Sequence, residues 1–494
     1  MVEFELKLEV PPVRKAEVLS ALELTGVAAV SQSAHYFDTE DGRLAASGLS
    51  LRLRREGRRW VQTLKASGGS PVHRLEDSIA VRAPKGTPSV DLDRHCSPGA
   101  REALESALKT QGSPEWPVLV ERFLVKVSRR ARNIELADEH LEIAFDVGTM
   151  EAAGKKIPIC ELEIELKSGG SSEHMFELAK RLVHEHHLWL SLESKAARGE
   201  ALLASPQATS VAKALKVNFD PDDAGDQQLR AMVRNCLWQI LPNASKVAAG
   251  SEDSEQVHQL RVGLRRLRTV LREVGDLAPD VDPSWETPLS GTFRQLGVCR
   301  DQESMAKNLQ PRLLAAGAPE VASWPPPVTA ALAPSLTVRD PGFQTALLGV
   351  LAFSLRRKVD QLGKCPSPRQ LFAKKLNKLH TKVVSDGRRF TKLPIEQQHR
   401  VRKLLKRLRY LSEFGKPLFK QGKVERYLER LRPAQDALGA HNDDAIALEA
   451  WQRHPPTDAG AWFAVGWLSA NQVHTAESCR QALKQISNSD RFWA

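Results

Sequence analysis

Apolar and polar residues alternate in short stretches through the first 200 residues of the chain. Alternation with a period of two is typical of strands that bury one face. Two segments with helical spacing, Val13–Glu23 and Glu173–His187, interrupt these stretches. We therefore predict a mainly β domain with flanking helices. The predicted strands are Val2–Leu8, Ser50–Arg54, Trp60–Lys65, Leu119–Val127, Leu141–Phe145 and Ile159–Lys167.

The pattern changes to a 3.6-residue period from about Asp226 onward, where Leu, Ala, Arg and Lys dominate. Such a period predicts amphipathic helices. Ser, Pro, Asp and Gly cluster over 205–225, and a second break, with Trp324 followed by three prolines, lies within 315–341. Clusters of these residues are typical of loops and linkers. We predict an α+β chain with a β domain at 1–204, a linker at 205–225 and an all-α domain at 226–494.

The helical part repeats itself. HQLRVGLRRLR at 258–268 returns as HRVRKLLKRLR at 399–409, and the LG pair at 296–297 returns at 438–439. The two offsets, 141 and 142 residues, differ by only one position. Self-similarity at a fixed spacing is the mark of duplicated structural units. We therefore expect two helical bundles, at about 226–340 and 341–494.

Charge is divided unevenly between the two parts. Residues 1–200 hold 28 Lys and Arg against 31 Asp and Glu, a net charge of −3, while the rest of the chain carries +14. A strongly basic half points to a polyanionic partner, although a solubility role remains open. The six cysteines form no CxxC pair, no apolar run is long enough for a membrane span, and the charged N-terminus is unlike a signal peptide. We expect a soluble cytoplasmic protein that does not bind membranes.

Several predicted strands carry charges on one face only. Successive side chains of a strand point to opposite faces, so Glu3, Glu5 and Lys7 share one side. The three glutamates of 161–165 and the Arg52–Arg54 pair repeat this arrangement. A solvated outer face would explain any single strand. Several such strands together favour a closed antiparallel barrel whose polar faces line a tunnel, with Mg²⁺ or Mn²⁺ relieving the repulsion between carboxylates.

Six blocks of sequence together resemble the CYTH, or triphosphate tunnel, family. They are ExExK at 3–7, YFDT at 36–39, GLSLRLRREG at 48–57, WVQTLKA at 60–66, ELEIELKSG at 161–169 and SKAARG at 194–199. The resemblance implies a closed barrel with a metal-dependent activity on triphosphates. Inorganic triphosphate, hydrolysed to pyrophosphate and phosphate, is the expected substrate.

The resemblance also implies roles for individual residues. It identifies Glu3, Glu5 and Lys7 as catalytic. Positions that match phosphate contacts are Arg52, Arg54, Lys65, Lys126, Arg129, Lys195 and Arg198. Carboxylates that match metal ligands or further acidic positions are Glu3, Glu5, Asp146, Glu161, Glu163 and Glu165, with Glu76 of less certain role. The strand with Lys126 and Arg129 departs from the family pattern, because Val125 stands where Thr is expected and Arg132 where Trp is expected.

The repeated basic motifs resemble the CHAD family, whose members are regarded as binders of inorganic polyphosphate. On a helix His258, Arg261, Arg265 and Arg268 form one stripe, and the second motif repeats it. The expected polyphosphate-binding residues are His258, Arg261, Arg265, Arg266, Arg268, His399, Arg402, Lys406, Arg407 and Arg409. Nucleic acid is the less favoured ligand, since the stripes hold no aromatic residue apart from Tyr410 for base stacking. The two histidines could contact phosphate, bond to a neighbouring helix or bind metal.

Two further functions remain open from the sequence. The tunnel could act on an organic triphosphate, as a class IV adenylyl cyclase or a thiamine triphosphatase does. It could also hold phosphate chains without hydrolysing them, as a non-enzymatic scaffold. The acidic residues favour an enzyme, because pure anion binding would be better served without five glutamates.

Overall fold

The computed structural model describes residues 2–70, 73–82, 86–109, 115–169, 171–203, 211–319, 332–356, 366–453 and 458–494. The first 200 residues form an antiparallel sheet with the strand order β5-β4-β3-β2-β6-β7-β8-β1-β9. Its strands are β1 (Val2–Glu9), β2 (Val30–Asp38), β3 (Leu49–Glu56), β4 (Arg59–Ser70), β5 (His73–Val81), β6 (Val120–Leu136), β7 (Glu139–Ala152), β8 (Lys155–Ser168) and β9 (Trp189–Leu190).

The expected strands are present, but the sheet is larger than the alternation indicated. β6, β7 and β8 extend well beyond the predicted stretches, and β2 and β5 were not predicted as strands. The predicted helix at Val13–Glu23 is a 3-10 turn followed by α1 (Lys15–Ala21). Polar residues interrupt the alternation in β2 and β5, so neither strand has a clear sequence signal.

The two ends of the sheet meet over a short distance only. β1 pairs with β8 from Glu5 to Glu9, and with β5 through three residue pairs, Val2–Phe4 against His73–Leu75. Beyond Phe4 the other neighbour of β1 is β9, not β5. The expected closed barrel is therefore corrected: the nine-stranded antiparallel sheet is not closed into a barrel, and β1 and β5 pair over three residues only.

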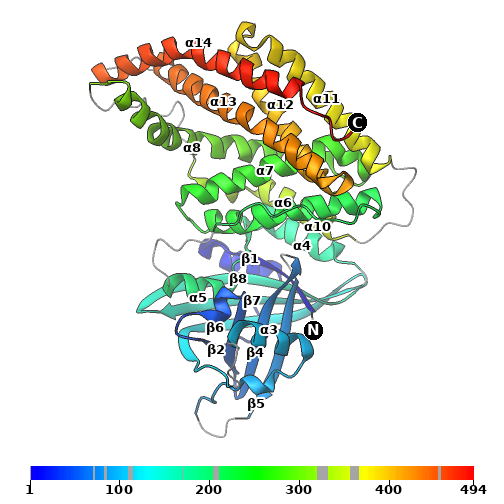
Figure 1. Cartoon of the computed structure of the whole chain (residues 1–494). Helices are drawn as coiled ribbons and strands as arrows, with labels where there is room; N and C mark the ends of the chain where they lie inside the picture. Colours follow the sequence, from blue (N-terminus) through cyan, green and yellow to red (C-terminus); the bar gives the residue numbers. More distant parts are fainter. Residues whose placement is uncertain are drawn as a thin grey trace. The chain divides into compact units, whose positions relative to one another are not determined.

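Helices cover the apolar outer face of this sheet (Figure 1). α3 (Pro98–Leu108) buries Ala100, Leu104 and Leu108 against leucines of β3 and β4. α4 (Glu173–His186) buries its own apolar stripe, and its Phe176 ring lies 6.2 Å from that of Phe4. Since the outer face is apolar and covered, the charged side chains on the alternate positions point to the concave inner face.

The inner face changes character along the strands. At one end it is apolar, with Tyr36, Phe123, Val125 and Met150 in one buried cluster. The short helix α5 (Lys195–Leu203) packs on this cluster, and a Cβ at Gly199 would lie 2.3 Å from the Phe123 ring. Glycine is therefore required for α5 to lie this close. Further along β6, β7 and β8 the inner face becomes charged, beginning at Arg129, Asp146 and Glu161.

The chain divides into two compact units, one of residues 1–213, 238–256 and 338–352, and one of 214–237, 257–337 and 353–494. The second unit is helical. Its helix α12 (Ile395–Phe414) packs between α11 (Pro368–Arg388) and α13 (Gln421–Arg453), and α14 (Ala459–Ser487) lies beside α11 and α13. No helix that the structure describes is both long enough and apolar enough to cross a membrane. The larger helices beyond residue 213 are α6 (Gly225–Ala248), α7 (Ser254–Val274), α8 (Glu286–Ala315), α10 (Pro341–Leu355), α11 (Pro368–Arg388), α12 (Ile395–Phe414), α13 (Gln421–Arg453) and α14 (Ala459–Ser487); α9 (Pro334–Val338) and α2 (Arg43–Ala46) are short.

Candidate functional site

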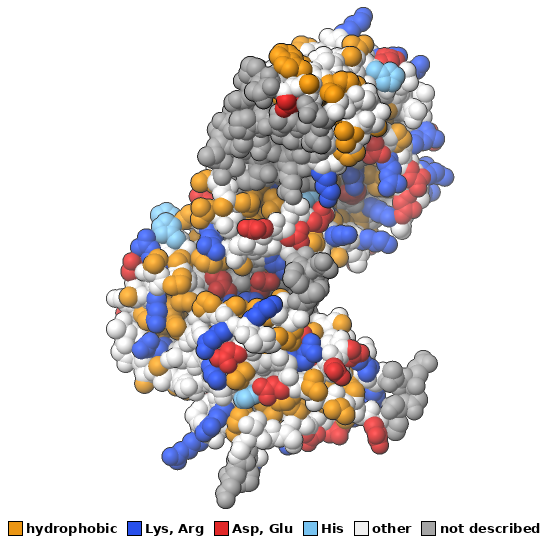
Figure 2. Space-filling view, turned by 90° about the vertical axis from the view of Figure 1, so that its left-hand side faces the viewer, with side chains coloured by type: hydrophobic (Ala, Val, Ile, Leu, Met, Phe, Trp, Pro, Cys, Tyr) orange, Lys and Arg blue, Asp and Glu red, His pale blue; other side chains and the backbone are white. Residues whose placement is uncertain are grey.

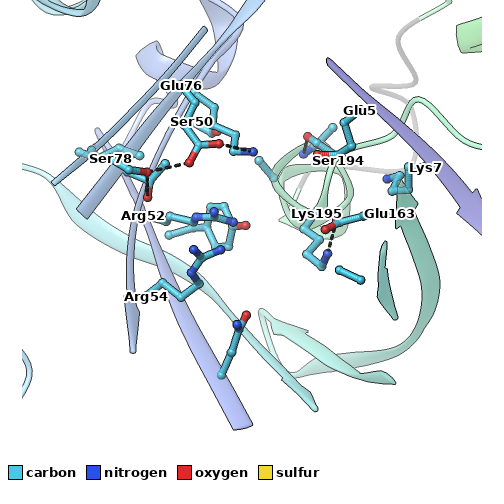
Figure 3. A pocket seen from close by; sticks show the side chains of 18 of the residues that line it. Glu5, Lys7, Ser50, Arg52, Arg54, Glu76, Ser78, Glu163, Ser194 and Lys195 are labelled. Carbon is cyan, nitrogen blue, oxygen red and sulfur yellow. Dashed lines mark hydrogen bonds and ion pairs between the residues drawn. The ribbon is translucent and has the colours of Figure 1, made fainter. Parts of the chain in front are cut away.

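A cavity of about 1220 Å³ lies within the concave face of the sheet. Figure 3 shows its two walls, with Arg52 and Arg54 projecting from one side and Glu163 and Lys195 from the other. The basic wall comes from β3 and β4, and the acidic wall from β1, β7 and β8. Basic and acidic side chains thus face one another across an open space.

Arginines crowd the basic wall. Arg52 makes no ion pair with a carboxylate among the described residues, and Arg54 pairs with Glu56 at 2.5 Å. Burial, together with the nearby guanidinium groups of Arg52 and Arg129, lowers the pKa of Arg54 to about 10. This wall therefore holds more positive charge than its own carboxylates neutralise.

Lys65 extends the basic wall and is paired. Its Nζ lies 2.7 Å from a carboxylate oxygen of Glu76, and Ser78 Oγ donates a hydrogen bond to Glu76 Oε1. Burial alone would raise the pKa of Glu76, but the Lys65 ammonium and the hydrogen bonds lower it to about 2. Glu76 is therefore an ionised partner that orients Lys65.

Three carboxylates on the acidic wall share one ammonium group. Oxygens of Asp146, Glu161 and Glu163 lie within 4.8 Å of one another. Lys195 Nζ is 2.7 Å from Asp146, 2.8 Å from Glu163 and in direct contact with Glu161. Arg129 pairs with Asp146 and Glu163, and Arg198 pairs with Glu161. Burial opposes ionisation of Glu163, but Lys195 and Arg129 hold its pKa well below the usual range.

A second acidic group lies further along the same wall. Glu5 of β1 is the cross-strand partner of Glu165, which is in turn the partner of Glu142 on β7. Lys167 pairs with Glu165 at 2.7 Å and with Glu142 at 3.6 Å. Burial and the neighbouring carboxylates raise the pKa of Glu165, against the effect of Lys167. This group has an excess of negative charge.

Lys7 lies between the two acidic groups and is 6% exposed. Its Nζ has no hydrogen-bond partner among the described residues, and its ion pair with Glu161 spans 4.0 Å. Burial lowers the pKa of this ammonium group. Burying an ammonium group without a close acceptor costs free energy. An anion that enters the cavity would offset this cost at Lys7.

Most residues expected in the tunnel do lie in or beside this cavity. Lys126 is an exception, because inner positions of β6 are those of Phe123 and Arg129, and Lys126 points to the opposite face. Its side chain is 56% exposed and lies 3.9 Å from Glu151. The prediction that Lys126 contacts substrate is therefore corrected. Glu3 lies on β1, but its side chain is outside the described residues.

The donor set fits a hard divalent cation. Asp146, Glu161 and Glu163 offer only carboxylate oxygens, the ligands that Mg²⁺ and Mn²⁺ prefer, from adjacent strands. The buried Lys195 ammonium already lies among these oxygens. A position that stabilises one buried cation is electrostatically suited to another.

In the helical unit the two basic stripes lie on α7 and α12. Arg261 and Arg265 of α7 have their guanidinium carbons 5.2 and 5.1 Å from the centre of the Phe293 ring. On α12, Arg402 lies 4.0 Å from Asp443, and Lys406 is close to Arg265 and Arg402. Figure 2 shows Lys and Arg side chains gathered with Asp and Glu on the visible helical surface. We name Arg261, Arg265, Arg402 and Lys406 the basic cluster.

The other predicted residues of the two motifs serve mainly in packing or in local ion pairs. Arg266 is 3% exposed, donates a hydrogen bond to Asn235 Oδ1 at 2.7 Å and lies over the Phe414 ring. Arg407 donates to Glu273 at 2.7 Å and joins α12 to α7. The burial of Arg266 corrects the prediction that it binds a ligand, whereas Arg407, with 27% of its side chain exposed, remains a predicted ligand contact. Arg268 pairs with Glu286 and Arg409 with Glu413; His258 and His399 are half-buried, and burial lowers the pKa of His399.

The basic cluster should make stability depend on pH. Burial and the charges of Arg265 and Arg402 lower the pKa of Lys406 to about 6. In the unfolded chain this lysine keeps its ordinary pKa near 10.5, so between these values the unfolded state binds more protons. Stability then rises with pH through this window, by up to about 1.4 kcal/mol per pH unit for one such group.

Lys406→Met should remove this contribution. In phosphate-free buffers, the wild-type protein should gain free energy of unfolding relative to the variant between pH 6 and pH 8. Chemical denaturation at several pH values measures the difference, in which the other titrating groups cancel. Parallel curves for the two proteins would show that Lys406 keeps an ordinary pKa in the folded state.

Two residues of the sites had no clear sequence signal. Glu142 is the only acid on the inner face of β7 before Asp146, and it joins the second acidic group through its cross-strand neighbour Glu165. Phe293 lies one turn before Gly297, and the guanidinium groups of three arginines of α7 lie beside its ring. A single phenylalanine on a helix is usually interpreted as a core residue, so the sequence did not indicate this role.

Comparisons with known proteins agree with this architecture. Residues 1–199 match the model of the CYTH domain and residues 231–452 that of the CHAD domain. Over 172 residues the chain is 29% identical to an inorganic triphosphatase of Haemophilus influenzae; this match covers 35% of the chain and 46% of that protein, less than half of its length.

Two solved structures are also similar to parts of the chain. The CHAD domain from Ricinus communis is 24% identical, with a TM-score of 0.45, and the match covers 58% of this chain and 99% of that one. A candidate adenylyl cyclase from Hippeastrum, described as revealing a dominant triphosphatase activity, is 18% identical with a TM-score of 0.29, over 42% of this chain and 100% of that one. The two family matches establish that the chain carries a CYTH domain followed by a CHAD domain.

Proposed function

We propose that the CYTH domain hydrolyses inorganic triphosphate to pyrophosphate and phosphate with the help of a divalent metal ion. The observation that carries this proposal is the pair of opposed walls in one cavity, with Arg52 and Arg54 facing Glu163 and Lys195. The similarity to an inorganic triphosphatase of Haemophilus influenzae supports the same substrate.

The basic wall supplies the binding of the phosphate chain. Arg52 and Arg54 can donate paired hydrogen bonds to phosphate oxygens, while Lys65 and Lys7 act as point charges. Since Arg52 has no carboxylate partner among the described residues, its charge is free to neutralise substrate. Burial is the main cause of the lowered pKa of Arg54, and a bound triphosphate would offset the repulsion from Arg52 and Arg129 that adds to it.

The acidic wall supplies the metal ligands and orients water. Asp146, Glu161 and Glu163 are the residues that would hold a divalent cation, with Glu5 and Glu165 further along the wall. When bound, such an ion neutralises phosphate charge and polarises the attacking water. The remaining carboxylates accept hydrogen bonds from that water and keep it in line with the terminal phosphoryl group. No covalent nucleophile is required.

We further propose that the basic cluster of the CHAD domain binds inorganic polyphosphate. Arg265, Arg402 and Lys406 bring like charges from two helices together, at a cost that a polyanion would offset. The Phe293 ring already lies beside the guanidinium groups of Arg261 and Arg265, and no aromatic residue belongs to the basic cluster itself, so a ligand with charge but no bases is favoured over nucleic acid.

A substrate panel tests the enzymatic proposal. The full chain is incubated with triphosphate, longer phosphate chains, ATP and thiamine triphosphate, each with Mg²⁺, Mn²⁺ or EDTA. Triphosphate should yield phosphate and pyrophosphate in equal amounts with metal and nothing with EDTA. Cyclic AMP from ATP, or faster release from thiamine triphosphate, would identify an organic substrate instead. Binding of triphosphate without any phosphate release would indicate a scaffold.

A further inference from the structure

The position of Lys195 has a consequence for metal binding. It is the first residue of α5, and its side chain is 10% exposed. Its ammonium group contacts Asp146, Glu161 and Glu163, three carboxylates contributed by β7 and β8. These oxygens lie within 4.8 Å of one another, a spacing that would also suit the ligands of a single metal ion.

Charge balance argues that the ammonium and a metal ion exclude one another. Three carboxylates face Lys195, Arg129 and Arg198, and Lys7 and Glu9 add one further charge of each sign, so this group is already neutral. Adding a divalent cation would place positive charges a few ångströms apart in a buried site, which costs several kcal/mol. The cost falls if a cation leaves, and Lys195 is the one in contact with all three carboxylates.

Lys195 also has a place to go. It lines the cavity of about 1220 Å³ between the two walls, whereas the small cavity of about 20 Å³ beside it is lined by Arg52, Arg54 and Arg129 and would repel a cation. The four-carbon stem of lysine is flexible, whereas α5 is fixed by the close packing of Gly199 on Phe123. The ammonium group can therefore turn into the large cavity that Lys195 lines while the helix stays in place (Figure 3).

We propose that Lys195 is a built-in competitor of the metal ion: it occupies the Asp146, Glu161 and Glu163 carboxylates in the metal-free protein, and metal binding releases it toward the phosphate chain. The inference rests on the proposed function only in that these carboxylates bind a divalent cation. It makes Lys195 a positioning residue that couples metal loading to substrate binding, because the cation that the metal displaces is then available to phosphate oxygens.

Metal affinity in the absence of substrate tests the competition. Calorimetric titration of metal-free full-length Lys195→Met with Mn²⁺ should give a dissociation constant at least about tenfold lower than that of the wild type, since the competing charge is gone. Thermal unfolding should show a lower midpoint for the metal-free variant and a larger gain on adding metal. Lys195→Arg, which keeps the charge, should stay near the wild type. An unchanged or weaker affinity in Lys195→Met would overturn the proposal.

Lys167→Met is the matched control. Lys167 pairs with Glu142 and Glu165 of the second acidic group, so its removal should leave the affinity unchanged. A gain in Lys167→Met without one in Lys195→Met would place the metal at Glu142 and Glu165 and reject the competition.

Chemical labelling tests the release in the wild-type protein. Acetylation of lysines, read by mass spectrometry, should modify Lys195 slowly without metal and several-fold faster at saturating Mn²⁺. Equal protection in both states would show that Lys195 stays with the carboxylates. Because neither measurement uses hydrolysis, both remain decisive for a protein that turns over no triphosphate, and an activity failure alone would reject only the proposed reaction.

Discussion

Replacing Arg52 with alanine should lower kcat/KM for triphosphate by roughly 100- to 1000-fold, the loss found when one positioned donor to a developing charge is removed. Arg52 projects into the cavity and has no carboxylate partner among the described residues, so its charge is available to substrate. Its removal also relieves the crowding that lowers the pKa of Arg54. Tyr36 and Glu76, however, raise the pKa of Arg52 despite its burial, so the variant should unfold at a slightly lower temperature than the wild type. A single cooperative unfolding transition in the variant separates a catalytic loss from a folding defect.

Lys126→Ala is the control for this experiment. Lys126 is a basic residue of the same sheet whose side chain is exposed on the outer face of β6. Its removal should change kcat/KM by less than about twofold, as expected for an exposed charge outside the cavity. Wild-type turnover in Arg52→Ala would show that the basic wall does not bind the substrate.

The double variant Arg265→Ala/Arg402→Ala should weaken polyphosphate binding by about 100-fold at low salt, since each charge-assisted contact is worth roughly a factor of ten or more. These two arginines come from α7 and α12 and are close to Lys406 between them. The slope of log affinity against log salt should also become shallower by about 1.5, because two fewer counterions are displaced per bound chain.

Lys484→Ala provides the comparison for charge alone. Lys484 is exposed on α14, outside the basic cluster. Replacing it with alanine removes one positive charge, as the replacement of each arginine does. The affinity of the Lys484→Ala variant for polyphosphate should remain close to that of the wild type. Equal weakening in both proteins would indicate a general electrostatic attraction without a defined cluster, and tighter binding of an oligonucleotide than of polyphosphate would contradict the proposed ligand.

The sequence predicted the charged face of each strand better than the closure of the sheet. Alternation in ExExK places Glu5 and Lys7 on one face, and both line the cavity. The same rule gives Arg52 and Arg54. Alternation does not reveal which strands become neighbours, because pairing depends on contacts far apart in the sequence. This is why Glu142 was missed and why the short meeting of β1 with β5 could not be foreseen.

Lys126 and Arg266 show the other limit of pattern reasoning. Lys126 is close in sequence to Arg129, and Arg266 to Arg265. A count of charges does not distinguish the residue that faces a site from its neighbour. On β6 the alternation of side chains places Lys126 on the face of the sheet opposite to that of Arg129. On α7 the side chain of Arg266 turns into the packing with Asn235 and Phe414, whereas Arg265 stays on the stripe. A buried arginine needs partners that only the folded structure supplies.

The change of the inner face from charged to apolar has a consequence for linear substrates. Beyond Arg129 and Asp146 the surface is formed by Phe123, Val125 and Met150 and is covered by α5. A phosphate group that advanced onto this surface would lose part of its hydration there and would find donors only on the basic wall, at Arg52 and Arg54. For the proposed phosphate substrates, this boundary would limit how far a chain advances. Chains of different length would then align by one terminus and differ in how far the other reaches back toward solvent.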